Sequence, residues 1–505
     1  MPPPSLPPHS LDVLILADLH YTSLARHTCP ISARQAPLAR ELMHKALHRL
    51  RQTGVEPQLI ILLGDLVDNG QAPGAELDLA RLAGDLQKTG IRVLAVPGNH
   101  DNAPERYAGL FDSAPGLHLV NGYGFLLFSD QRGENEHYSR TPESLAWPSQ
   151  IAAQHPDTPL IAVQHNPLHP AIQSGYPYLL DNSDAVSAGY RDARVLLSLS
   201  GHYHPGQSLH EHEGVAYATT PALAETPFAF QHLRLEGRRF ELTTHTLRIG
   251  VPGLCDVHCH TEFAYCATTV SAGVNRVLAE QLGLGTLCLT EHAFHLYFPC
   301  EIAWTYDWQR DRGLAEAVWN GSPRRGRMAA YRRFAAAQRG PGVRIGLEVD
   351  LMAGGELLLH PDDATGWDLL VGAVHEIDTV RKGTPQAEME RLFMRDLERL
   401  LTYPIQVLAH PFRIFTRHQM AKPEHLYREV AQRLARAGVA AEINFHTNQP
   451  EPAFLRACLD AGVRLALGSD AHRFEEVADF DPHLRLLREV GLEMDDVARH
   501  LYAPI

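Results

Sequence analysis

The sequence has little of what marks a secreted, membrane-spanning or disordered protein. Its seven cysteines are odd in number and follow no framework spacing, which predicts a reducing compartment without disulfides. The N-terminus has no basic region, and the apolar run over 11–17 is too short for a signal or membrane segment. We therefore expect a cytoplasmic protein with no membrane partner. Residues 1–10, which are rich in proline, are expected to form a disordered tail.

Positive charge is also scarce in this chain. The 45 Lys and Arg residues stand against 59 Asp and Glu residues, which gives a net charge of -14. Because an acidic chain repels phosphate backbones at long range, extended nucleic acid is a disfavoured partner. A small phosphorylated molecule remains compatible as a substrate.

Histidine, by contrast, is abundant. The chain has 30 histidines among its 505 residues, and imidazole is the commonest metal ligand in proteins. A chain of this length exceeds what one hydrophobic core usually supports, so we expect two domains of about 250 residues each.

In the first half, five short apolar runs each end in a polar cluster, and helical periodicity over 36–53 and 74–89 separates the first three. The carboxyl ends of such strands are where open α/β sheets bind ligands. Asp, Asn and His together suit divalent metals, and one carboxylate can bridge two ions. The alternating residues 205–248 predict antiparallel strands that close a second sheet. The clusters are Asp18 and His20; Asp65; Asn99, His100 and Asp101; His165; and His202 and His204.

The motifs D-L-H, G-D-L-V-D, G-N-H-D, a lone His and G-H-Y-H closely resemble those of the calcineurin-like metallophosphoesterases, including the branch with bacterial cyclic-nucleotide phosphodiesterases. The resemblance covers residues 11–248 and implies a four-layer α/β/β/α sandwich. It implies one metal on Asp18, His20, Asp65 and His204, and a second on Asp65, Asn99, His165 and His202. It also implies attack on phosphorus by a bridging hydroxide, with His100, paired with Asp101, protonating the leaving oxygen. The chain departs from many cyclic-nucleotide enzymes at Asn166, where they have a second His.

The second half repeats the pattern of an apolar run that ends in metal-ligand residues. Helical segments over 388–401, 423–437 and 451–461 alternate with these runs, which predicts a β/α barrel with its site at the carboxyl ends of the strands. The clusters are Asp256, His258 and His260; Glu291 and His292; Glu348; His375; His410; Glu442 and Asn444; and Asp470 and His472.

These residues resemble the PHP (polymerase and histidinol phosphatase) family over about 253–490, especially its histidinol-phosphatase-like members. The resemblance implies a distorted (β/α)7 barrel that holds two or three ions. It implies His258, His260, Glu348 and Asp470 on one ion, Glu348, His375 and His410 on a second, and His292 and His472 on a third. Where relatives often have a further histidine this chain has Cys266, so either Cys266 or Glu262 completes the third site. The metals expected in both halves are Mn, Fe or Zn.

Two further segments are candidates for binding substrate. The irregular, aromatic and arginine-rich stretch 293–347 is expected to form a loop and helix over the barrel mouth. Its aromatics could stack on a base or sugar and its arginines could clamp phosphate, or the helix could simply carry a solvated basic face. Arg413, three residues after His410, is the better single candidate for a substrate phosphate.

We therefore expect the chain to consist of a metallophosphoesterase domain over 11–249, a short linker over 250–253 and a PHP domain over 254–505. So short a linker predicts that the two domains pack in a fixed relation. Because neither half lacks a core ligand, the leading hypothesis is a bifunctional metal-dependent phosphoesterase. The alternatives are a nuclease or nucleic-acid-editing phosphodiesterase, and one active domain beside a metal-stabilised binding module.

Overall fold

The computed structural model describes residues 10–504 except 24–30, 102–106, 108 and 321, and the side chains of 318–326. The chain divides into two compact units, Met1–Arg248 and Ile249–Ile505. Apart from Ser10, the proline-rich tail lies outside the described residues. No helix within the described ranges is both long enough and apolar enough to cross a membrane.

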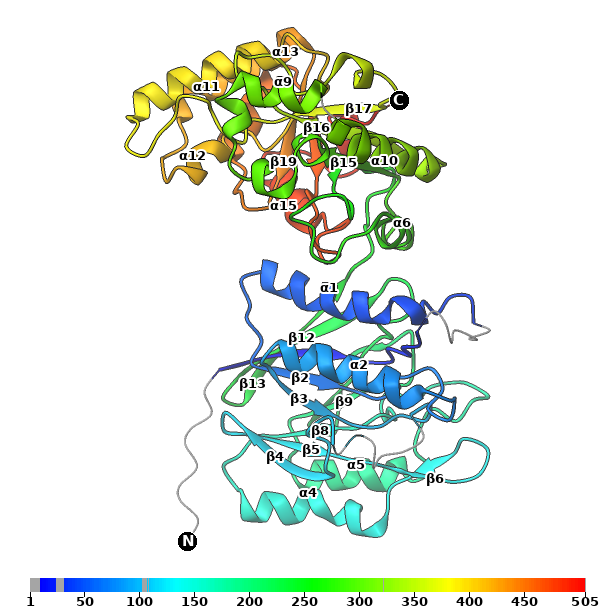
Figure 1. Cartoon of the computed structure of the whole chain (residues 1–505). Helices are drawn as coiled ribbons and strands as arrows, with labels where there is room; N and C mark the ends of the chain where they lie inside the picture. The colour runs from blue at the N-terminus through cyan, green and yellow to red at the C-terminus, as the bar shows by residue number, and fades with distance from the viewer. Residues whose placement is uncertain (1–9, 24–30, 102–106, 108, 321, 505) are drawn as a thin grey trace. The chain divides into compact units, whose positions relative to one another are not determined.

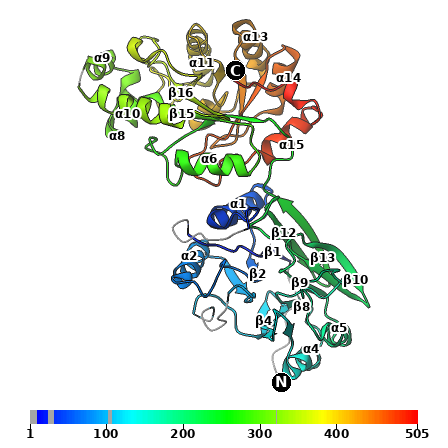
Figure 2. The same ribbon diagram turned by 90° about the vertical axis from the view of Figure 1, so that its right-hand side faces the viewer.

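The first unit contains a five-stranded sheet with the strand order β13-β12-β1-β2-β3. Its three parallel strands are short runs of branched apolar residues, and helices α1 (Ala39–Gln52) and α2 (Ala75–Lys88) lie over one face (Figures 1 and 2). Both helices match the ranges expected from periodicity to within three residues. The strands are β1 (Leu11–Leu16), β2 (Leu59–Leu62), β3 (Arg92–Ala95), β12 (Ala229–Glu236) and β13 (Arg239–Thr246).

A second, six-stranded sheet has the order β10-β11-β9-β8-β5-β4. Helices α4 (Pro142–Gln154) and α5 (Ser183–Asp192) pack on its outer face through a second apolar cluster that includes Val186 and Tyr190. Its strands are β4 (Gly116–Val120), β5 (Tyr123–Leu127), β8 (Leu160–Val163), β9 (Leu197–Ser200), β10 (Gln207–His212) and β11 (Val215–Thr219).

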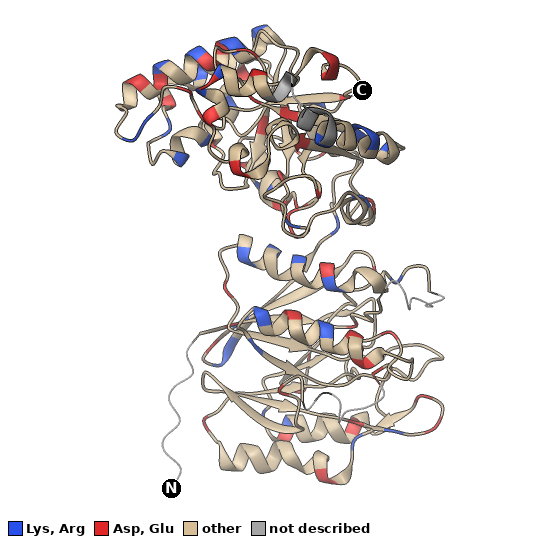
Figure 3. Cartoon of the chain, in the orientation of Figure 1, with Lys and Arg blue, Asp and Glu red and all other residues tan. Residues whose placement is uncertain are grey.

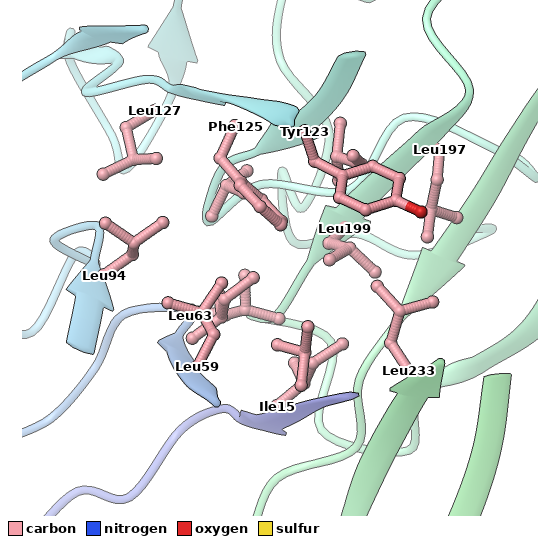
Figure 4. Close-up of a cluster of buried hydrophobic side chains, with 14 of the residues drawn as sticks. Ile15, Leu59, Leu63, Leu94, Tyr123, Phe125, Leu127, Leu197, Leu199 and Leu233 are labelled. Atoms are coloured by element: carbon pink, nitrogen blue, oxygen red, sulfur yellow. The ribbon is translucent and has the colours of Figure 1, made fainter. Parts of the chain in front are cut away.

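The main core of this unit fills the space between the two sheets. Alternate residues of β1 and β2, such as Ile15 and Leu59, face Phe125 of β5 and Leu199 of β9 (Figure 4). Each of these four side chains is fully buried, and burying a side chain of this size contributes about 1.5–3 kcal/mol. The result is a four-layer α/β/β/α sandwich, which confirms the predicted fold of this half.

One expectation for this unit is wrong. The strands of residues 205–248 do not all close the second sheet, because only β10 and β11 join it. β12 pairs antiparallel with β1, and β13 follows on β12, so this hairpin extends the first sheet. Alternation along a strand shows that it is half-buried but does not show which sheet its backbone joins.

The second unit is built around a closed barrel of seven parallel strands, in which β14 pairs with β20. Every described strand runs in the same direction, and each ends beside a candidate ligand, which confirms the predicted (β/α)7 barrel. The strands are β14 (Cys255–Cys259), β15 (Thr286–His292), β16 (Val343–Val349), β17 (Leu369–Gly372), β18 (Val407–Leu408), β19 (Ala440–Asn444) and β20 (Leu465–Gly468).

Helices flank the barrel strands (Figure 2). The expected segments 388–401, 423–437 and 451–461 correspond to α11, α13 and α14, with ends that differ by at most four residues. Three short helices, α7 to α9, and the longer α10 occupy the segment between β15 and β16. The helices are α6 (Ala272–Gln281), α7 (Ala293–Tyr297), α8 (Cys300–Ala303), α9 (Arg312–Asn320), α10 (Ser322–Gln338), α11 (Gln386–Leu400), α12 (Arg413–Arg417), α13 (Tyr427–Ala437), α14 (Pro452–Asp460) and α15 (Asp481–Glu489).

A buried ion pair joins Asp130, which follows β5, to Arg140, which precedes α4. Arg140 is 2% exposed, and its Nε and Nη2 donate to the two carboxylate oxygens of Asp130 at 2.8 and 3.1 Å. The guanidinium also contacts the hydroxyl of Tyr190 at 2.5 Å and lies 3.6 Å from the ring centre of Phe128. Removing one partner of such a pair leaves the other charge buried and uncompensated.

We therefore expect Arg140→Leu to lower the free energy of unfolding of the first unit by about 3–5 kcal/mol. The matched control is Arg191→Leu, because Arg191 is an exposed arginine paired with Glu213, and we expect a much smaller loss, since water screens an exposed ion pair. Hydrogen exchange in urea, read on peptides from 123–163, measures both losses unit by unit. Equal losses in the two variants would contradict the argument.

Candidate metal centres

The predicted ligands of the first unit follow the ends of five strands and converge at one edge of the sandwich. Asp18, His20, Asp65 and His202 adopt left-handed φ angles of 52°, 45°, 50° and 68°. Non-glycine residues rarely adopt this conformation, and it persists where the surrounding structure holds it, most often at functional sites.

Asp65 lies at the centre of this cluster. Its Oδ2 is 3.7 Å from His20 Nε2 and 3.6 Å from His165 Nε2. His20 Nε2 lies 3.2 Å from His204 Nε2, and His165 Nε2 lies 3.0 Å from Asn99 Oδ1. The structure thus brings together two groups that could each hold an ion. These groups are Asp18, His20 and His204, and Asp65, His165 and His202.

Hydrogen bonds on the far side of the rings orient these histidines. His204 Nδ1 lies 2.8 Å from Glu225 Oε1, and His165 Nδ1 lies 2.7 Å from the carbonyl oxygen of Leu63. Each bond places a proton on Nδ1 and leaves Nε2 as a metal-ligating lone pair. Sequence analysis missed Glu225, because it lies in the loop between β11 and β12, away from any strand end.

The proposed pairing of His100 with Asp101 is wrong. His100 Nδ1 donates instead to the carbonyl oxygen of Asp68 at 2.6 Å. The Asp101 carboxylate accepts from the backbone N–H groups of Leu66, Val67 and Gly98 at 2.8, 3.1 and 2.8 Å. Asp101 therefore ties two ligand loops together, a role that its place in the G-N-H-D motif does not reveal.

The electrostatics of this cluster fit a divalent cation. Burial raises the pKa of Asp18 to about 6, and burial together with His165 lowers the pKa of His202 to about 3. His202 is therefore neutral at pH 7, as a metal ligand must be, and its buried Nε2 has no hydrogen-bond partner among the described residues. A cation at this point would both ligate that nitrogen and stabilise the ionised form of Asp18.

A glycine allows the ligand loops to approach closely. A Cβ on Gly98 would collide with the Asp65 carboxylate and with its backbone nitrogen. Beside the loops lies a cavity of about 380 Å³, and its lining includes Asn99, Arg132 and His165. Two of the predicted metal ligands, Asn99 and His165, therefore also line a cavity that could hold substrate.

In the second unit Glu348 lies at the centre of the ligand cluster, as Asp65 does in the first. It is fully buried at the end of β16. Its carboxylate oxygens lie 3.4 Å from His258 Nε2, 3.3 Å from His375 Nε2 and 2.9 Å from His410 Nε2. His260 Nε2 lies 2.9 Å from Asp470 Oδ1. The predicted ligands of the first two ions thus meet within the barrel.

Carboxylates orient the histidines of the barrel. His258 Nδ1 lies 2.8 Å from Glu442 Oε1, and His375 Nδ1 lies 2.9 Å from Asp350 Oδ1. Within the described part of the chain, His258 Nε2, His375 Nε2 and one oxygen of Glu348 are buried without a hydrogen-bond partner, which is the donor set that a divalent cation satisfies. Asp350 was missed, although it stands two residues after Glu348 in E-V-D, a spacing that faces the same way along a strand.

A third group lies beside these two. His472 donates through Nδ1 to the carbonyl oxygen of Asp470 at 2.7 Å and groups with His260 and His292. Cys266 Sγ lies 3.5 Å from His292 Nε2. Glu262, the alternative to Cys266, accepts instead from the N–H of Ala272 at 2.9 Å, at the start of α6.

His295 is an additional candidate ligand that sequence analysis did not identify. It groups with Cys266 and His292, so that three ligand atoms lie within 4.8 Å of one another. Its Nδ1 accepts from the N–H of Tyr265 at 3.2 Å, and its buried Nε2 has no hydrogen-bond partner. The spacing of three residues from His292 was the available signal, because α7 begins directly at the end of β15.

In the segment over the barrel mouth, some side chains line a cavity and others pack in the core or bind backbone. Trp304 and Tyr306 line a cavity of about 620 Å³, whereas Trp308 is fully buried in the core. Arg327 donates to the carbonyl oxygens of His295 and Phe263, so this arginine holds backbone and not phosphate. Arg413 lines the same cavity, with Nη1 2.8 Å from Asp470 Oδ2 and Nη2 2.7 Å from His410 Nε2.

Comparison with known protein families gives two matches. The profile of the calcineurin-like phosphoesterases matches residues 11–206, and that of the PHP domain matches residues 256–446.

Individual relatives match one half each. A cAMP/cGMP dual specificity phosphodiesterase of Mycobacterium tuberculosis is 26% identical over 33% of the chain, which spans about half (54%) of that relative. A probable cyclic nucleotide phosphodiesterase of Moraxella catarrhalis is 28% identical over 40% of the chain and 74% of its own length. A probable histidinol-phosphatase of Deinococcus radiodurans is 27% identical over 47% of the chain and 94% of its own length.

The Cys266 group generates a spectroscopic prediction. If cobalt is loaded in place of the native ions, a thiolate ligand gives a sulfur-to-metal charge-transfer band in the near ultraviolet. We expect the band in the unsubstituted chain and its loss in Cys266→Ser, together with about one ion fewer per chain. Cys458→Ser is the matched control, because Cys458 is a buried thiol of α14. A band that survives Cys266→Ser would rule out the thiolate.

Proposed function

We propose that both halves of the chain are active hydrolases of phosphoric esters, because residues 11–206 match the calcineurin-like phosphoesterases and residues 256–446 match the PHP domain. The observation that carries the proposal is that each half gathers a full set of ligand atoms around one buried carboxylate, Asp65 or Glu348. A structural remnant would be expected to have lost some of these groups.

In the first half, we assign the proton transfer to His100. Bound divalent ions would supply Lewis acidity toward a phosphoryl oxygen and a more acidic water. The bond from His100 Nδ1 to the Asp68 carbonyl oxygen orients the ring, so that Nε2 is the nitrogen from which a proton would pass to the leaving oxygen. The N–H of His100 also donates to Asp65 Oδ1 at 2.8 Å, which couples the position of this acid to the central carboxylate.

We further propose that the first half opens a phosphodiester and the second removes the phosphomonoester that results. The names of the mycobacterial and Moraxella relatives support a small diester for the first half, and the name of the Deinococcus relative supports a monoester for the second. The pairing of the two sites in one chain is the reason to connect them in sequence.

Surface charge supports small substrates over long polyanions. On α11 acidic and basic side chains are interspersed (Figure 3), and several pair with one another. Arg391 pairs with Glu388 at 2.6 Å, and Arg395 pairs with Asp396 at 2.7 Å. A nucleic-acid surface needs unpaired positive charge along its track.

A paired-variant experiment tests the division. With Mn²⁺ loaded, we expect His100→Ala to lower the rate of diester hydrolysis by about 10²–10⁴-fold when the leaving group is an alkoxide. The loss should be much smaller when the leaving group is p-nitrophenolate, because that group leaves without protonation. Monoester hydrolysis should remain. His258→Ala should remove monoester hydrolysis and leave the diester rate within about twofold, because the two clusters share no residue.

The two variants also have a control that does not depend on activity. Metal analysis should show fewer ions per chain in His258→Ala and the full number in His100→Ala, since His100 is not among the ligands predicted for the first site. Equal loss of both activities in either variant would contradict the proposal. Cleavage of single-stranded oligonucleotides by the unsubstituted chain, with an affinity that falls steeply with salt, would favour a nuclease instead.

A further inference from the structure

The cavity above the barrel site is lined with positive charge. Its described lining includes Arg413, Arg417 and Arg473 and contains no Asp or Glu. The carboxylates beneath it, Glu348 and Asp470, belong to the predicted metal clusters. Glu476, which contacts three lining residues, accepts from the backbone N–H of His472 at 2.8 Å and pairs with Arg473 at 3.1 Å and with His446 at 3.4 Å. A ligand in this cavity therefore meets cations.

Two of these arginines, Arg413 and Arg417, place positive charge at two different positions in the cavity. Both lie on α12 (Arg413–Arg417), and residues four apart on a helix face the same way with about 5–6 Å between their Cβ atoms. Arg413 contacts Asp470 and His410 at the metal cluster. Arg417 is exposed one turn further along α12, and its Nη1 donates to the hydroxyl of Tyr306 at 3.3 Å.

An aromatic surface completes the cavity. Trp304 is 45% exposed and lines the same space, and its ring meets His295 edge-on with 4.9 Å between ring centres. The guanidinium of Arg417 lies 4.7 Å from the ring centre of Tyr306, which holds it in place without neutralising its charge. A half-exposed, supported indole is a surface on which a planar ring stacks.

We infer that the second site takes phosphomonoesters that carry a planar ring and a second anionic group, with Arg417 as the residue that binds the second anion. This inference rests on the proposed phosphomonoesterase function of the barrel. It argues against histidinol phosphate, because the ammonium of that ester would enter a cavity of three arginines whose described lining has no carboxylate to receive it.

Three esters provide the test. Phenyl phosphate and 4-carboxyphenyl phosphate differ only in the second anion, and histidinol phosphate is an alkyl ester that carries an imidazole ring and an ammonium. Phosphate release is measured with the full chain loaded with Mn²⁺ and carrying Asp65→Asn, which silences the first site. We expect kcat/KM for the carboxylated ester to exceed that for phenyl phosphate by about tenfold, as one charge-assisted hydrogen bond allows.

The ratio of the two aryl esters should fall to about one in Arg417→Gln and recover in part in Arg417→Lys. Comparing the ratio between chains cancels the difference in leaving-group acidity. Arg391→Gln, on α11 outside the cavity, is the control for lost positive charge and should keep the ratio. An unchanged ratio in Arg417→Gln, or histidinol phosphate as the best substrate, overturns the inference alone. Release of phosphate from none of the three esters overturns the proposed function together with it.

Discussion

The structure of both halves depends on burying a carboxylate among imidazoles. Asp65 and Glu348 are at most 1% exposed, and a buried carboxylate is costly unless opposite charge or hydrogen-bond donors compensate it. At Glu348, burial opposes ionisation, but the surrounding histidines outweigh it and hold its pKa well below the usual range. The same histidines have buried nitrogens without hydrogen-bond partners. Protein groups alone leave this network incomplete, and divalent cations would complete it.

The two folds reach this arrangement through the same local device. Parallel strands deliver their last residues to one edge, and the backbone then turns sharply, as at Asp65 and Asp470 with φ of 50° and 49°. Such conformations cost of order 1–3 kcal/mol each, so the surrounding loops must hold them. Asp101 does so in the first half through three backbone N–H groups, and in the second half Gly468 leaves room for Glu442.

The placement of ligands at strand ends explains which features could be predicted from the sequence. Ligands at strand ends are local signals, so the clusters and both fold classes were predicted from apolar runs followed by Asp, His or Glu. Residues that act across the fold carry no such signal. Glu225 orients His204 from a loop, and the hairpin of β12 and β13 joins the first sheet through backbone pairing with β1. The His100–Asp101 pairing failed because adjacent side chains can serve different loops.

The two sites also differ in how their histidines are oriented, and this bears on how many ions each can hold. In the sandwich, one carboxylate, that of Glu225, orients His204, whereas His165 and His100 donate to neutral carbonyl oxygens. In the barrel, His258 and His375 meet the carboxylates of Glu442 and Asp350. A carboxylate behind an imidazole raises its basicity and adds negative charge to the site. The barrel therefore buries more acidic groups than the sandwich, and more cationic charge is needed to balance them, which is the electrostatic reason to expect a third ion there and only two in the sandwich.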